Sequence, residues 1–150
     1  MSRNKYFNPI FIILSMCLFL FLSPSVFSAT YYIDYASGSD SNNGKSTSTP
    51  WKRCPGMKGF ARSYSHSAGD VFVFKGGVTW PYTTLPLTIG YSGTSGNIDT
   101  YTVDATWYTG GAYSNPIFDG NMSLGAWNNG AITSINKSYQ IGRASCRERV

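Results

Sequence analysis

The chain has 150 residues, enough for one modest domain, with 12 Lys and Arg against 7 Asp and Glu and a formal net charge of +5. Most of that surplus lies at the two ends, in Arg3 and Lys5 and in the arginines of residues 141–150, so the composition excludes a basic face for binding nucleic acid. Aromatic residues make up 16% of the chain and Gly occurs 16 times, a mixture that is typical of short strands and tight turns.

Residues 1–28 have the layout of a secretory signal peptide. A positively charged start precedes the almost wholly apolar run 10–22, which a Ser-Pro step then ends. We expect cleavage after Ser28, with cleavage after Ala29 as the alternative. The apolar run is shorter than the about 20 residues of a membrane-spanning helix, which argues against a stable membrane anchor. The sequence therefore predicts a secreted protein, located in the periplasm, at the cell surface or outside the cell.

After the leader the pattern is one of short strands separated by turns, without a long helical period, which predicts an all-β fold. The segment 50–67, which includes Trp51 and Phe60, predicts a short helix or an irregular cap. A Gly69-Asp70 turn then leads into a wholly apolar strand. The predicted strands cover residues 30–34, 71–74, 85–89, 98–103, 116–118 and 131–135.

Four stretches in chain order carry a resemblance: YYIDYASGSDSNNGKSTSTPWKRCPGM, SAGDVFVFKGGVTW, LTIGYSGTSGN and NPIFDGN. Together, over most of residues 31–121, they resemble the N-terminal portion of secreted right-handed parallel β-helix proteins of the pectate-lyase-like superfamily. The resemblance implies that residues 29–140 form the N-terminal cap and the first rungs of such a β-helix. The chain departs from the family where Ile98-Asp99-Thr100 precedes the second rung. A β-sandwich is the alternative architecture.

The resemblance also implies a function. The full-length protein is expected to be carbohydrate-active, with polysaccharide as its partner and lyase-type elimination, rather than hydrolysis, as its reaction. The lyases of this group use a Lys or Arg base and calcium held by acidic residues on middle rungs, downstream of the matched motifs. We therefore assign no catalytic residue, metal site or cofactor to this part, and expect it to be inactive alone. The alternative is a non-catalytic β-helix surface or adhesion protein.

Five side chains are candidates for chemistry or for packing. Trp107 and Trp127 are candidates to stack on sugar rings, although packing in the core or at a corner is the alternative for both and for Trp80. His66, the only histidine, is expected to be an exposed loop residue without a catalytic partner. Cys54, the only cysteine of the body, predicts a lone buried or partly buried thiol, or a disulfide with a partner outside this sequence.

The polar loop 38–46 is similar to two ligand-binding motifs but fulfils neither. The spacing between Gly38 and Gly44 is one residue longer than a phosphate-binding loop requires. Asp40, Asn42 and Gly44 match part of a calcium loop, but the glycine comes one place early and no bidentate Glu follows. The loop is therefore predicted to be a polar turn.

Residues 141–150, IGRASCRERV, differ from everything before them in their density of arginine. Residue for residue they match the translation of a widely used short-read sequencing adapter, and Gln140 fits the bases that precede it there. We expect this tail to be an adapter-derived artefact, which would leave residues 29–140 as an incomplete part of a longer β-helix domain. A genuine basic tail is the alternative.

Overall fold

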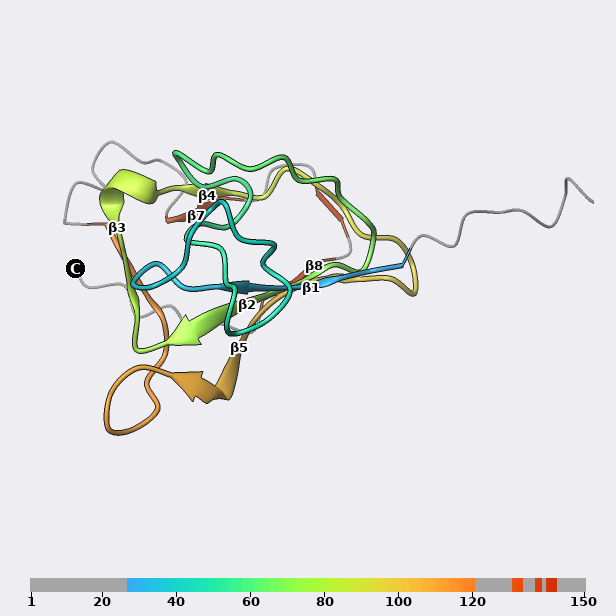
Figure 1. The fold of residues 1–150 in the computed structure, drawn as a ribbon. Coiled ribbons are helices and arrows are strands. Elements are labelled where there is room, and N and C mark those ends of the chain that lie inside the picture. The colour runs from blue at the N-terminus through green and yellow to red at the C-terminus, as the bar shows by residue number, and fades with distance from the viewer. Residues whose placement is uncertain (1–26, 121–130, 134–136, 139, 143–150) are drawn as a thin grey trace, which may run out of the picture.

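The computed structural model describes residues 27–120, 131–133, 137–138 and 140–142, and within them the chain is mostly β (Figure 1). The regular elements of these residues are short strands and one 3₁₀ helix, η1 (Tyr82–Thr84). No helix of this part is long and apolar enough to cross a membrane. The strands are β1 (Thr30–Ile33), β2 (Val71–Gly76), β3 (Thr79–Pro81), β4 (Leu87–Thr88), β5 (Asp99–Tyr108), β6 (Ile117–Asp119), β7 (Ile132–Thr133) and β8 (Gln140–Gly142).

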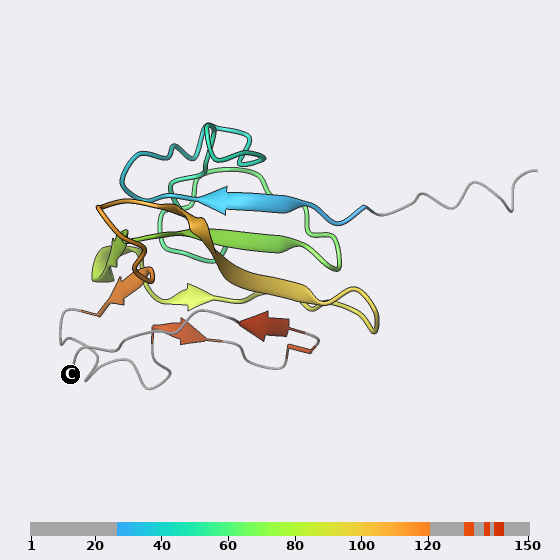
Figure 2. The ribbon, with the colours of Figure 1, turned by 90° about the horizontal axis from the view of Figure 1, so that it is seen from below.

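The strands form three sheets in which the paired strands are parallel, with the orders β1-β2-β5-β8, β3-β6 and β4-β7. The chain visits the sheets in a repeating order. β2, β3 and β4 lie one in each sheet, β5, β6 and β7 return to the three sheets in the same order, and β8 returns to the first. Figure 2 shows β1, β2 and β5 lying side by side in the four-stranded sheet.

The predicted strands are confirmed, with changes at their ends. The strand predicted over 98–103 continues to Tyr108, because the chain bulges and then rejoins β2. Two strands, β3 and β8, were not predicted: β3 is short and ends at a proline, and β8 crosses into the predicted tail with Ile141 and Gly142. Residues 143–150 lie outside the described residues.

An aromatic stack fills the interior beside the four-stranded sheet. Tyr31, Phe72 and Tyr101 are register partners on β1, β2 and β5. Their ring centroids are 5.6 Å and 5.0 Å apart, and Trp51 stacks on Tyr31 at 4.4 Å. All four side chains are buried, and in-register stacking of this kind stabilises neighbouring strands.

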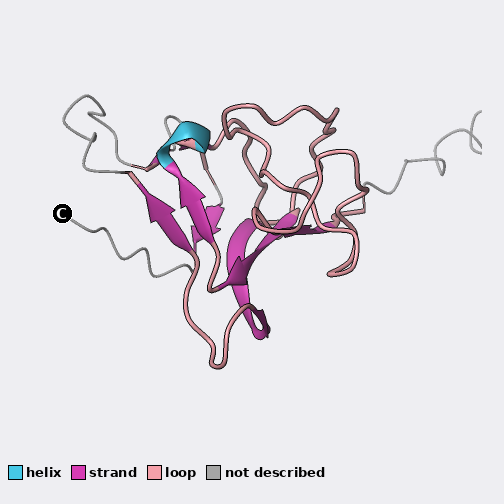
Figure 3. Ribbon diagram, turned by 60° about the vertical axis from the view of Figure 1, so that its left-hand side comes forward, coloured by secondary structure: helices cyan, strands magenta, loops and turns pink. Residues whose placement is uncertain are grey.

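The segment predicted as a helix or a cap is irregular, like much of the chain drawn as loop in Figure 3. It meets β1 at Trp51 and continues to η1 and β4, where Lys58 donates its N–H to the carbonyl of Thr84 and Gly56 accepts from the N–H of Thr88. Trp51 donates its backbone N–H to the carbonyl of Tyr32 at 2.9 Å, and Tyr32 donates its own to Gly44 at 2.8 Å. Gly44 has a φ of +72°, and a Cβ there would lie 2.6 Å from the Trp51 indole, so only glycine fits. The free edge of β1 is thereby hydrogen-bonded and covered.

Candidate functional site

The outward face of the four-stranded sheet carries the candidate that sequence reasoning singled out, Trp107. The β2–β5 register pairs Phe74 with Val103 and then Gly76 with Tyr108, so residues 104–107 stand opposite Lys75 alone. The Asp104 carboxylate closes this bulge by accepting from the backbone N–H of Thr106 at 2.8 Å and from its hydroxyl at 2.7 Å. The bulge brings Trp107 back over the sheet.

Trp107 is half-buried and rests on two side chains of the sheet. Its ring meets Tyr32 of β1 edge to face, with centroids 5.3 Å apart, and Lys75 Nζ lies 5.7 Å from its centroid. Trp107 therefore packs on the outer face of the sheet and not in the core, and packing at a corner stays its alternative, whereas Trp80 is fully buried against Phe118 and packs in the core. Trp127, the second candidate, lies outside the described residues.

The position of Lys75 is fixed by a buried carboxylate. Asp34 accepts a hydrogen bond from Lys75 Nζ at 2.8 Å, from the backbone N–H of Ala36 at 2.9 Å and from the hydroxyl and N–H of Ser37. Burial alone would raise the Asp34 pKa, but the hydrogen bonds from Lys75 and Ser37 outweigh it and lower the pKa below its ordinary value. The ammonium is therefore compensated and held under the Trp107 ring.

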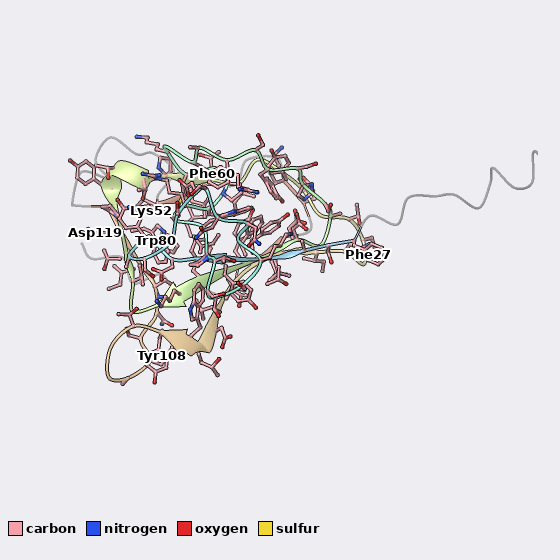
Figure 4. All side chains as sticks on the ribbon, viewed as in Figure 1. Phe27, Lys52, Phe60, Trp80, Tyr108 and Asp119 are labelled. Atoms are coloured by element: carbon pink, nitrogen blue, oxygen red, sulfur yellow. The ribbon has the colours of Figure 1, made fainter. Side chains whose placement is uncertain are left out.

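Sequence reasoning missed two exposed tyrosines: Tyr108, the last residue of β5, and Tyr113 on the loop that follows. Tyr108 and Tyr113 are 38% and 37% exposed, and their rings meet edge to face at 6.1 Å. The loop protrudes from the body, with Tyr108 at its base in Figure 4. It is seated on Gly76 and Gly77: a Cβ on Gly77 would lie 2.3 Å from the carbonyl oxygen of Thr109. The sequence signal that could have indicated them is the occurrence of two tyrosines five residues apart around a Gly-Gly turn.

A second polar cluster lies at the corner where β2 and β5 begin. Asp70 and Asp99 are wholly buried there and lie side by side at the starts of neighbouring strands, because Val71 pairs with Thr100. Asp70 accepts from the backbone N–H of Ala29 at 2.7 Å, and Asp99 accepts from the N–H of Gly69 at 2.8 Å. Asp99 therefore places a second carboxylate acceptor beside Asp70 at this corner.

His66 lies in a loop, as predicted, but the prediction that it is exposed is wrong. Its side chain is 16% exposed, and Nε2 lies 2.9 Å from Oδ2 of Asp99 while the ring stacks on Tyr91 at 4.8 Å. The carboxylate lies 33 residues further along the chain, so local sequence gave no indication of this partner. Next to it, Tyr64 donates to Asp70 at 2.6 Å, and burial together with this bond raises the pKa of Tyr64.

The remaining candidates have structural roles in the described residues. The loop 38–46 is closed as a turn: Asp40 pairs with Arg53 at 2.7 Å, and Asn42 donates to the Pro50 carbonyl at 2.9 Å. Cys54 is a buried free thiol, and burial raises its pKa well above the ordinary value. Within the part of the chain that the structure describes, no group of three or more His, Cys, Asp or Glu is placed to hold a metal ion.

Comparison with known proteins adds no assignment: no protein-family model matches the chain, and no curated protein sequence matches it.

Proposed function

We propose that the chain is the N-terminal part of a secreted right-handed parallel β-helix protein that binds polysaccharide. The repeating visit to three parallel sheets supports the β-helix, because each return of the chain adds a strand to every sheet. The right hand follows the general handedness of parallel crossover connections. The β-sandwich alternative is disfavoured, since sandwiches are built from antiparallel sheets.

The observation that supports polysaccharide binding best is the aromatic outer surface, which we define as Tyr32, Trp107, Tyr108 and Tyr113. Aromatic side chains of this kind present apolar faces with polar tips, which suits sugar rings. Trp107 is held from below by Tyr32 and Lys75, so its ring loses little freedom when a ligand binds. The pair Tyr108 and Tyr113 extends the surface along the loop.

Elimination in the full-length protein is the reaction that we propose, with calcium as its cofactor, and both rest on the resemblance. The buried carboxylates Asp34, Asp70 and Asp99 all accept hydrogen bonds that hold the fold together. None of these three is free to bind calcium or to act as a base. This observation favours an inactive part that contributes binding only, and it equally favours the second candidate, a non-catalytic surface or adhesion protein.

Affinity electrophoresis of the full chain tests the proposal, with polygalacturonate, alginate or neutral galactan in the gel. We expect retardation by at least one polysaccharide, and about a tenfold loss of affinity in Trp107→Ala through the loss of ring stacking. Trp107→Phe keeps a ring and should lose less. Tyr82→Ala is the matched control, because Tyr82 is 44% exposed on η1, outside the four-stranded sheet.

Equal retardation of the wild type and Trp107→Ala would exclude this surface, and no retardation by any of the three would contradict polysaccharide binding. The longer protein distinguishes the two candidate functions. Unsaturated product from a retained polyuronate supports elimination, and retention without product supports adhesion.

A further inference from the structure

Among the described residues, Ala29 is the first whose backbone N–H and carbonyl are both hydrogen-bonded to the rest of the fold. Its backbone N–H donates to Asp70 Oδ1 at 2.7 Å, and its carbonyl accepts from the N–H of Val71 at 2.9 Å. Of the two described residues before it, Ser28 is exposed and Phe27, labelled in Figure 4, is 83% exposed. The Ser28–Ala29 peptide bond therefore joins an exposed residue to the first residue that is hydrogen-bonded to the fold through both backbone groups.

The acceptor at this boundary is an anionic group buried inside the protein. The Asp70 side chain is wholly buried, and its second oxygen accepts from the Tyr64 hydroxyl at 2.6 Å and from the N–H of Ser67 at 3.1 Å. Three neutral donors thus surround one carboxylate, and the ion pairs of the described residues do not include it. A buried carboxylate is stabilised far better by a cationic donor than by neutral donors.

We propose that proteolytic removal of the leader occurs at the Ser28–Ala29 bond and that the new α-ammonium group of Ala29 forms an ion pair with Asp70. Hydrolysis adds one water to the peptide bond, leaving a carboxylate on Ser28 and an ammonium on Ala29. The amide donor at 2.7 Å thereby becomes a charged donor at the same place. This inference rests on the secretion proposed above.

The same contacts decide between the two cleavage positions that the sequence leaves open. Cleavage after Ala29 would remove both of its hydrogen bonds and take away the donor that Asp70 Oδ1 has in the fold. An unsatisfied buried acceptor is strongly destabilising. Cleavage after Ser28 keeps both bonds and strengthens one.

The first part of the test is the N-terminus of the exported protein. The full chain is expressed with its own leader in a secreting host, and the exported product is analysed by intact mass and N-terminal sequencing. We expect it to begin at Ala29. A product that begins at Thr30 overturns this inference and leaves secretion intact, whereas a chain that keeps residues 1–28 overturns both.

The second part measures the ion pair. Inserting one Ala between Ser28 and Ala29 leaves an extra residue after processing, so that Ala29 keeps an amide and the charge moves away. We expect the folding equilibrium constant from urea unfolding to fall about tenfold, because a charge-assisted bond becomes a neutral one. In an Asp70→Asn background the insertion should have no effect.

Asp99→Asn provides the matched control. Asp99 accepts the N–H of Gly69 in the same way at the next rung, but its donor is unchanged by processing. The full effect of the insertion should therefore persist in that background. An insertion that leaves the wild type unchanged, or that destabilises Asp70→Asn equally, overturns the ion pair.

Discussion

The aromatic stack and the carboxylate corner occupy neighbouring parts of the same strands, yet they hold the strands together in different ways. In the stack, Tyr31, Phe72 and Tyr101 differ in chemistry and still pack in register, because burial and ring contact depend little on which aromatic is present. At the corner, Asp70 and Asp99 are the same residue type with matched acceptor roles. The stability of the stack therefore depends on buried side-chain volume, whereas that of the corner depends on specific hydrogen-bond acceptor atoms.

The largest expected effect is at the middle of the stack. Phe72→Ala removes the ring between Tyr31 and Tyr101, and should lower the free energy of unfolding by about 4 kcal/mol through lost burial and a residual cavity. Urea unfolding of the exported protein measures it. Phe72→Leu, which keeps most of the volume, should lose about 1.5 kcal/mol or less. Equal losses in the two variants would show that the stack depends on ring geometry and not on volume.

At the corner, we expect a substitution that conserves side-chain volume to lower the free energy of unfolding all the same. Asp99→Leu leaves the Gly69 N–H and the His66 ring without their acceptor, and should lower the free energy of unfolding by about 3 kcal/mol. Asp99→Asn keeps one acceptor oxygen and should lose about half as much. The comparison between stack and corner breaks down if Leu is tolerated at Asp99 as well as at Phe72.

The smallest effect concerns Asp34, the buried carboxylate that holds Lys75. Its pKa is lowered in the folded protein, so it contributes stability above its unfolded pKa, and this contribution is lost as the pH falls through the folded value. Lys75→Met removes one of the donors that lower this pKa and should cost about 1 kcal/mol at neutral pH. The loss of stability on acidification from about pH 6 to about pH 3 should be smaller in Lys75→Met than in the wild type. Parallel stability–pH curves would contradict this assignment.

Much of the mostly β fold could be predicted from the sequence. The apolar run beginning at Val71 and the turn at Gly69 report directly on local backbone geometry, and β2 begins where they indicate. The short strands β3 and β8 could not be predicted, because three residues show no period and no run of apolar residues marks them. Their pairing depends on a partner from another turn of the chain.

The candidate site was predictable only in part. Trp107 could be proposed as an exposed aromatic, but its place over Tyr32 depends on a bulge that appears only when β5 is aligned with β2. The partner of His66 was missed for a similar reason, since Asp99 reaches it only through the register of the next rung. Sequence reports which side chains are available, and register decides which of them meet.

The parallel register also constrains the order in which the protein folds. Thr30 pairs with Val71, Val71 with Thr100 and Asp99 with Gln140. Each strand of this sheet therefore pairs with a strand that lies about 30 to 40 residues later in the chain. Such non-local pairing folds slowly, but each strand of the sheet needs only the strand before it as a template. β1 and its irregular cover can therefore form first, as the platform to which β2, β5 and β8 are added in chain order.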